Sequence, residues 1–167
     1  MKVEIRNETA ADVDAIDAVT TAAFLGAPHT SHTEQFIVKA LRKDGKLTVS
    51  LVAEVQGEVV GHVAVSPVST SDGALGWYGL GPISVAPTCQ GRGVGSLMHE
   101  ALRALRESGA AGCVVLGEPD YYGRFGFQTE PGVVLPGVPP EYFQVLSFGS
   151  ALPCGNVSYD ESFNARS

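Results

Sequence analysis

The sequence predicts a mixed α/β domain with an antiparallel strand pair followed by a parallel one. Residues 47–55 and 58–68 are β-rich and only two residues apart, a spacing typical of an antiparallel hairpin. Residues 77–86 form an apolar run that leads through a glycine-rich turn into residues 94–106, whose apolar side chains recur at the spacing of one helix face. A strand at residues 112–116 follows, and a right-handed crossover would place it parallel to the strand before the turn.

Length and charge narrow the class of protein. The 167 residues are expected to form a single domain, with a core at about 1–130 and a C-terminal extension at about 131–167 packed on it. The formal net charge is −7 and no Lys/Arg cluster occurs, which argues against a nucleic-acid partner and mildly favours a cationic substrate such as an amine. The chain shows no leader and no apolar run near the length of a membrane span, so we expect no membrane partner.

The cysteines and histidines indicate neither a disulfide framework nor a metal site. Cys89, Cys113 and Cys154 form no C-x-x-C pair, and the four histidines are scattered without the spacing of metal ligands. An odd number of cysteines without a leader favours reduced thiols. We therefore expect a cytoplasmic protein that uses no metal ion.

The first quarter of the chain is expected to hold a strand and two helices. Residues 2–6 alternate apolar and polar side chains and predict a short strand, and a helix at about 10–24 follows with Thr9 as its N-cap. A second helix is predicted to run from about Ser31 or His32 to Arg42, because Ser31 and Glu34 have the S-x-x-E spacing of a capping box.

Two features of the β-rich region bear on chemistry. His62 lies within an apolar strand, where a histidine is usually a hydrogen-bonded core residue; a catalytic role is the alternative. Gly79, Gly81 and Pro82 are unusual inside a strand and suggest a β-bulge, which would leave backbone N–H groups available to a ligand. The alternative is that these residues end one strand and begin another.

The last third of the chain carries a short helix and a proline-rich tail. Pro119 suits the first turn of a helix, Gly126 ends it, and Phe127 begins another strand. The tail from Glu130 contains several prolines, but its aromatic residues indicate that it packs on the domain. Residues 156–163 are expected to add a last strand.

The glycine-rich turn points to an anion. Its string Gln90-Gly91-Arg92-Gly93-Val94-Gly95-Ser96 opens a helix, where unpaired N–H groups and the helix dipole favour negative charge, so that pyrophosphate is the expected ligand. The string lacks the Gly-Lys-Ser/Thr of a Walker A loop and the G-x-G-x-x-G spacing of a dinucleotide site. The alternative is a turn whose glycines serve packing only.

Two motifs resemble those of a known superfamily. The turn fits Q/R-x-x-G-x-G/A and follows Val85-Ala86-Pro87, and Tyr121-Tyr122 precedes Gly126-Phe127. With these motifs the chain resembles the GCN5-related N-acetyltransferase (GNAT) superfamily, and in particular its YhbS-like group of predicted acetyltransferases, over about residues 1–130. The resemblance implies a mostly antiparallel central sheet with a splayed parallel strand pair, helices on both faces, and acetyl-CoA as co-substrate.

The resemblance also implies roles for individual residues. Ile83, Ser84 and Val85 would lie along the pantetheine arm and pair with it through their backbone. Tyr122 would sit near the coenzyme sulfur as the general acid. The pyrophosphate would be bound by the N–H groups of Gln90, Gly91, Arg92, Gly93, Val94, Gly95 and Ser96.

The acceptor side of the resemblance is less complete. His29 and Glu34 would border the acceptor pocket, and Glu118 lies in the region of the general base. Many members of the superfamily place an Asn after the strand that ends here at Leu116, whereas this chain has Gly117. The pantetheine contact of that Asn is therefore not expected here.

These features predict an N-acetyltransferase. It would move an acetyl group from acetyl-CoA to a primary amine of a small molecule or protein by direct attack in a ternary complex, as a monomer or homodimer. The alternative is a non-catalytic acyl-CoA binding or sensor module with the same fold. A nucleotide-binding regulator is a third possibility, which the spacing of the turn disfavours.

Overall fold

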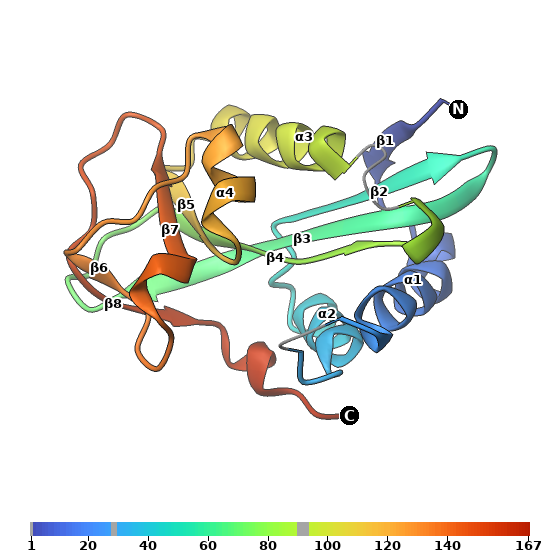
Figure 1. The fold of residues 1–167 in the computed structure, drawn as a ribbon, viewed down its shortest axis with the longest axis horizontal. Coiled ribbons are helices and arrows are strands. Elements are labelled where there is room, and N and C mark those ends of the chain that lie inside the picture. The colour runs from blue at the N-terminus through green and yellow to red at the C-terminus, as the bar shows by residue number, and fades with distance from the viewer. Residues whose placement is uncertain (1, 28–29, 90–93) are drawn as a thin grey trace.

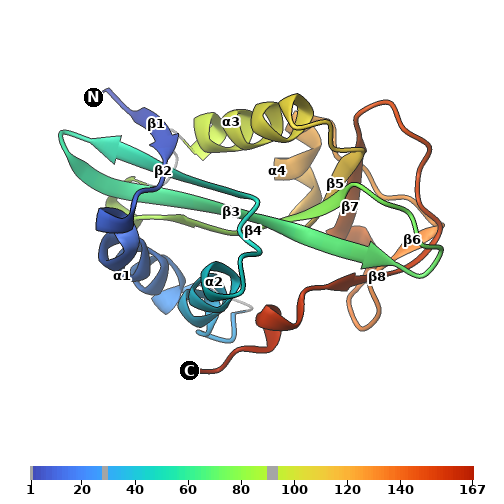
Figure 2. The same ribbon diagram turned by 180° about the vertical axis from the view of Figure 1, so that it is seen from behind.

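The computed structural model describes residues 2–27, 30–89 and 94–167. A mixed sheet runs through the molecule in the strand order β1-β2-β3-β4-β5-β7, with helices α1 and α2 on one face and α3 on the other (Figures 1 and 2). This arrangement confirms the predicted fold class. The strands are β1 (Glu4–Asn7), β2 (Val49–Val55), β3 (Glu58–Thr70), β4 (Trp77–Val85), β5 (Gly112–Leu116), β6 (Val133–Val134), β7 (Phe143–Ser147) and β8 (Gly155–Tyr159), and the α-helices are α1 (Val13–Leu25), α2 (Glu34–Lys43), α3 (Val94–Glu107) and α4 (Pro119–Tyr122).

The predicted hairpin is the antiparallel pair β2–β3. Gln56 and Gly57 turn the chain with φ values of 52° and 80°. Two consecutive residues with positive φ match the twist of the flanking strands, which is why a Gly is suited to this turn. Strands β1 and β4 extend the hairpin on either side, both antiparallel.

The predicted bulge lies in β4. Val63 pairs with Ile83 and Val65 pairs with Leu80, so Gly81 and Pro82 together oppose the single residue Ala64 on β3. An extra residue in one strand bends it and interrupts the ladder. The bulge therefore separates the first half of β4 from the second half, Ile83–Val85.

The parallel pair β4–β5 is short and splayed. Trp77–Gly79 pair with Gly112–Val114, and β4 has no further pairing with β5 in the described part of the chain. The pairing ends at Gly79 on β4 and Val114 on β5, although β4 continues to Val85. The crossover through α3 is the one that the sequence predicts.

The tail joins the sheet. Strand β7 pairs antiparallel with β5, and β8 pairs antiparallel with the end of β3, while β6 pairs with β8. The expected last strand is β8, which ends at Tyr159, before a 3-10 turn at Glu161–Asn164. Strand β7 was not predicted, and the strand predicted at Phe127 is reduced to one bridge between Gln128 and Val145.

The second helix begins later than the capping box predicts. Its N-cap is Thr33, and α2 starts at Glu34, so Ser31 lies outside the helix and binds the Thr33 hydroxyl instead. The reason is the backbone of His32, whose φ of 58° is left-handed and cannot continue a helix. Glu34 is thus the first residue of the helix rather than the third.

Candidate active site

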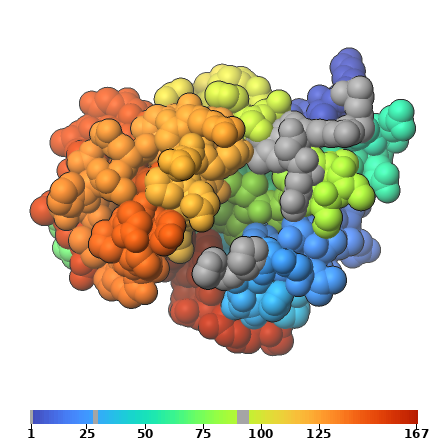
Figure 3. Space-filling model, viewed as in Figure 1, coloured from blue at the N-terminus to red at the C-terminus, as the bar shows by residue number. Residues whose placement is uncertain are grey.

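An open strand edge forms the centre of the candidate site. In the described part of the chain, the second half of β4 pairs with β3 on one side and with no strand on the β5 side. In the space-filling view, green atoms of this region are seen in a recess between the orange C-terminal segments and the blue N-terminal helices (Figure 3). Ile83, Ser84 and Val85, the predicted pantetheine neighbours, lie on this part of β4, with Ile83 half-buried and the other two buried.

The helix that follows the glycine-rich turn is present as predicted. Val94 begins α3, and Gly95 and Ser96 lie in its first turn, with Ser96 exposed. A Cβ added at Gly95 would meet no atom within 4 Å, so this glycine leaves open space beside the helix start. Residues 90–93 of the predicted pyrophosphate loop lie outside the described residues, as does His29.

Tyr122 lies on the short helix α4, in the segment between β5 and β7. It ends α4, which follows β5, and its ring makes edge contacts with Tyr121 and Phe127 at centroid distances of 4.9 and 6.1 Å. Burial raises the pKa of Tyr122 to about 12, and the neighbouring Tyr121 adds to the rise. The phenol is therefore protonated at neutral pH, as a proton donor must be.

Gly117, which follows β5 where many members of the superfamily have Asn, lies where a side chain would not fit. A Cβ at this position would lie 2.4 Å from Cε2 of Tyr122, so the ring occupies the space that a side chain would need. The Gly117 N–H donates to the Tyr142 carbonyl at 2.9 Å, and its carbonyl accepts from Nε2 of Gln144 at 3.0 Å. These bonds fix the backbone on which α4 and Tyr122 depend.

Strands β3 and β4 carry three buried polar side chains on the face of the sheet toward α1 and α2. Positions alternate between the two faces of a strand, and Val63 and Val65 pack in the core under α3. His62 and Ser66 therefore face α1 and α2, as does Ser84, which is directly opposite His62. The atoms His62 Nδ1, Ser66 Oγ and Ser84 Oγ are buried and have no hydrogen-bond partner among the described residues.

His62 is also the end of a hydrogen-bonded network. Its Nε2 lies 2.7 Å from Ser50 Oγ, and the Ser50 hydroxyl donates to a Glu8 carboxylate oxygen. Arg42 donates to both oxygens of Glu8 at 2.9 Å. Burial raises the pKa of Glu8, but the hydrogen bonds from Arg42 and Ser50 outweigh burial, and the net pKa is lowered. Glu8 is therefore ionised at neutral pH.

The predicted substrate carboxylates are placed apart from this network. Oε2 of Glu34 accepts a hydrogen bond from Thr30 at 2.6 Å, while its Oε1 is buried and has no partner in residues 2–27, 30–89 and 94–167. Glu118 is exposed and serves α4 through its backbone carbonyl, which accepts from the N–H groups of Tyr121 and Tyr122. Among the described residues no hydrogen bond or ion pair joins Glu34, Glu118 and Tyr122.

Two residues at the site escaped prediction from the sequence. Gln144 is buried and holds the Gly117 carbonyl. Tyr159 lies over Gly79, where a Cβ would be 3.3 Å from its ring, and its hydroxyl is buried without a hydrogen-bond partner in the part of the chain that the structure describes. The pairing of Val68 with Tyr159 brings this ring to β4, and no local pattern indicates that pairing.

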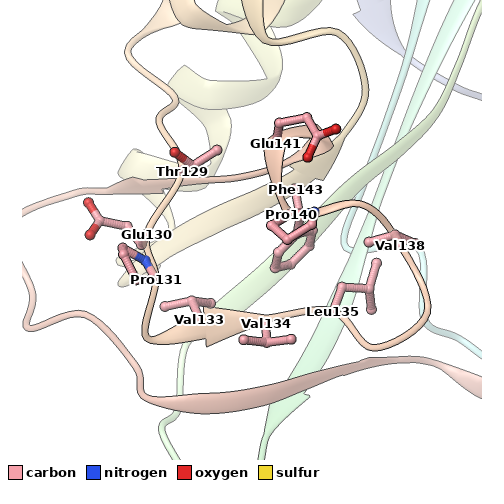
Figure 4. Close-up of a pocket in the computed structure, with 10 residues that line it drawn as sticks. All are labelled: Thr129, Glu130, Pro131, Val133, Val134, Leu135, Val138, Pro140, Glu141 and Phe143. Atoms are coloured by element: carbon pink, nitrogen blue, oxygen red, sulfur yellow. The ribbon is translucent and has the colours of Figure 1, made fainter.

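A separate pocket lies in the C-terminal third and has a different character. Its volume is about 560 Å³, and apolar side chains such as Val133, Leu135 and Phe143 line it (Figure 4). The carboxylates of Glu130 and Glu141 lie on different sides of it in this view. The pocket brings together no pair of groups suited to acid–base chemistry, so the candidate site remains the gap beside β4.

Metal and membrane signatures are absent from the described ranges. Among residues 2–27, 30–89 and 94–167, no three His, Cys, Asp or Glu side chains are grouped as a metal site would require. No helix in these ranges is both long and apolar enough to span a membrane.

Comparisons with known proteins agree with this geometry. Residues 4–129 match the acetyltransferase (GNAT) domain family. The chain is 40% identical over 126 residues to the uncharacterized N-acetyltransferase YhbS of Escherichia coli, covering 74% of this chain and 72% of that protein.

Solved structures extend the similarity to nearly the whole chain. A GNAT family acetyltransferase from Brucella melitensis in complex with acetyl-CoA is 45% identical, with a TM-score of 0.87 over 97% of this chain and 98% of that one. YhbS from Escherichia coli in complex with CoA is 36% identical, with a TM-score of 0.86 over 98% of this chain and 93% of that one. The family match spans most of the chain, and the chain belongs to the GNAT acetyltransferase family.

Proposed function

We propose that this protein is an N-acetyltransferase that moves an acetyl group from acetyl-CoA to a primary amine of a small molecule or peptide. The observation that carries the proposal is the second half of β4, Ile83–Val85, which pairs with β3 on one side and, in the described part of the chain, with no strand on the β5 side. An extended ligand can add to an open strand edge through backbone hydrogen bonds. The complexes of the two related structures with acetyl-CoA and CoA support this choice of ligand.

The residues present fit the co-substrate. Backbone groups of Ile83, Ser84 and Val85 would pair with its pantetheine arm, and N–H groups of Gln90, Gly91, Arg92, Gly93, Val94, Gly95 and Ser96 would bind its pyrophosphate. The absence of a side chain at Gly117 leaves room for the Tyr122 ring. The bound thioester supplies an acetyl group that is already activated, so the protein has to position, stabilise charge and move protons.

Different groups of the protein would carry out the separate parts of the reaction. Direct attack forms the C–N bond and breaks the C–S bond, with no covalent link to the protein. Backbone N–H groups at the bulge in β4 would stabilise the negative charge that develops on the carbonyl oxygen, an effect worth about 10²–10³ in rate. Tyr122 would give its proton to the departing sulfur, for a further factor of about 10²–10⁴. Holding both reactants in place can lower the barrier by roughly 7–11 kcal/mol.

The net charge suggests the kind of acceptor, and the free cysteines suggest the cellular compartment. The net charge of −7 favours a cationic acceptor, and the carboxylates of Glu34 and Glu118 would bind its ammonium group. Cys89, Cys113 and Cys154 are free thiols, which suits the reducing cytoplasm. The whole of residues 1–167 would act as one domain.

Two measurements test the proposal. Calorimetry should show acetyl-CoA binding to the natural protein and not to Gly93→Val, because a branched side chain would fill the phosphate cradle. Release of free CoA should then be measured with a panel of primary amines. Binding without CoA release from any amine would instead support an acyl-CoA sensor, and wild-type affinity in Gly93→Val would refute the assignment of the loop.

A further inference from the structure

The apolar pocket of the C-terminal third is built on fixed elements. Its lining includes Val133 of β6 and Phe143 of β7, both of which are buried in one cluster with Trp77. Strand β6 is held by its pairing with β8, and β7 by its pairing with β5. Pro131 and Pro140 also line the pocket, and a proline ring fixes the backbone φ angle of its residue. The pocket is therefore largely formed before a ligand enters.

The size and the lining of this pocket suit a small organic molecule. Ligand pockets commonly have volumes of about 300–1,000 Å³ and are lined mainly by apolar side chains, and the volume here is about 560 Å³. Val134 is exposed and Leu135 and Val138 are half-buried, so apolar surface is left for a ligand to cover (Figure 4). Removing such surface from water favours binding.

The ionisable groups that line the pocket are both acidic. Glu130 is half-buried and Glu141 is exposed, and no described Lys, Arg or His lines the pocket with them. Oε1 of Glu130 accepts a hydrogen bond from Nε2 of Gln128 at 3.0 Å, but neither carboxylate forms an ion pair with any residue that the structure describes. Two carboxylates attract a positive group and repel a negative one. Charge therefore favours a cationic ligand over a fatty acid or a phosphate compound.

We propose that this pocket binds an organic cation, a molecule whose apolar body carries a protonated amine. The apolar body would lie against Val133, Val138 and Phe143, and the ammonium group would be attracted to Glu130 and Glu141. The lining shares no residue with the candidate site beside β4, and binding here involves no covalent step. The inference thus goes beyond acetyl transfer and assigns a second, separate ligand site.

Three probes with the same body separate charge from apolar contact: phenylbutylamine, phenylbutanol and phenylbutyrate. Each is titrated, without acetyl-CoA, into protein labelled at its Val and Leu methyl groups, and binding is followed by methyl NMR. The amine should shift the signals of Val133, Val134, Leu135 and Val138. The alcohol should bind about twofold to tenfold more weakly than the amine, because ion pairs near a surface change affinity by small factors. The negatively charged phenylbutyrate should bind most weakly.

Two sets of variants remove one property of the pocket at a time. Glu130→Gln combined with Glu141→Gln keeps the shape and should lower the affinity for the amine to that for the alcohol. Its control, Glu58→Gln at the exposed start of β3, should leave the ratio of the two affinities unchanged. Val138→Phe narrows the pocket and should weaken all three probes by about tenfold or more. Its control is Leu75→Phe, at a leucine that is 88% exposed, which should bind like the natural protein.

Three results would overturn the proposal. The first is the absence of any shift of the pocket methyl signals up to the solubility limit of the amine. The second is equal affinity for amine and alcohol, which would describe a site for neutral apolar compounds. The third is an unchanged ratio of these affinities in the double glutamine variant, a comparison that holds even if Val138→Phe does not fold.

The outcome is distinguishable from that of the proposed function. The titrations contain no acetyl-CoA and measure no turnover, so they do not depend on acetyl transfer. A protein that binds phenylbutylamine in this pocket and acetylates no amine would retain the second site and lose the proposed function. A protein that acetylates amines without shifts at the pocket would retain the proposed function and lose the second site.

Discussion

The two faces of the sheet bury different kinds of side chain. Under α3 the buried residues are apolar, and helix residues such as Leu97, Met98 and Leu105 pack against the odd positions of β2 and β3. On the face toward α1 and α2, the buried set includes His62, Ser66 and Ser84. Buried polar groups without partners cost stability. The contrast assigns most of the stability to the α3 face and leaves groups for chemistry on the other.

The largest expected effect is on the proton donor. Tyr122→Phe should keep acetyl-CoA affinity and lower kcat by about 10²–10⁴, because the ring remains and only the acidic hydrogen is removed. Tyr121→Phe, on the same helix, is the matched control and should keep its rate. Pre-steady-state measurement of CoA release would show whether chemistry limits turnover. Full activity of Tyr122→Phe under that condition would exclude it as the acid.

The α3 face should respond to cavity formation. Leu105→Ala removes a fully buried side chain and should lower the free energy of unfolding by about 2–5 kcal/mol. Urea denaturation measures this loss, and kcat of the folded protein should be unchanged at low temperature. A large fall in kcat together with unchanged stability would contradict the division of labour between the faces.

The α1/α2 face should respond to pH instead. Burial lowers the pKa of His62 from about 6.5 to about 4, so below pH 6.5 the unfolded chain binds a proton that the folded protein does not. The free energy of unfolding should fall by about 3 kcal/mol as the pH drops through this range, since each pKa unit corresponds to about 1.4 kcal/mol. Urea denaturation at several pH values should show a shallower fall in His62→Gln; equal slopes would place the histidine in contact with water.

Substitution of Gly117, which follows β5, is expected to lower the rate by a smaller factor. Gly117→Ala places a Cβ in the space of the Tyr122 ring and should displace that ring. A misplacement of about 1 Å can lower a rate about 10²-fold, so kcat should fall by that order with acetyl-CoA affinity retained. Gly123→Ala, where a Cβ meets no atom within 4 Å, is the control. An unchanged rate in Gly117→Ala would mean that the ring can move without cost.

The smallest expected effect is a gain in stability rather than a loss. Ser66→Ala removes a buried hydroxyl that makes no hydrogen bond with any described residue. The free energy of unfolding should stay the same or rise by about 1 kcal/mol, because a desolvation cost disappears while no hydrogen bond is lost. Thermal unfolding measures the change. A loss of 2 kcal/mol or more would show that the hydroxyl is paired in solution.

The sequence predicts elements whose signals are local. The Gln56-Gly57 turn, the bulge at Gly81 and Pro82, and the crossover through α3 each depend on residues within one short stretch, and the structure confirms them. The start of α2 was misplaced because the capping box describes side chains, whereas the left-handed backbone of His32 decides where the helix begins.

Features that depend on pairing between distant strands could not be predicted. Strand β7 lies in a proline-rich stretch and becomes a strand only because β5 offers it an edge. The contact between Tyr159 and Gly79, and the pairing of His62 with Ser84, likewise require the register of the sheet. The roles of Tyr122 and of the pyrophosphate loop stay predictions that the variants above can test.

The splay of β4 and β5 also bears on solubility. A row of unpaired main-chain groups invites pairing with other polypeptides, and proteins commonly protect such rows by covering them. Here the row from Leu80 to Val85 is flanked by α4 and the C-terminal segments on one side and by the N-terminal helices on the other (Figure 1). These flanking elements would hinder a second folded chain from pairing with β4, while a narrow extended ligand would still fit against it.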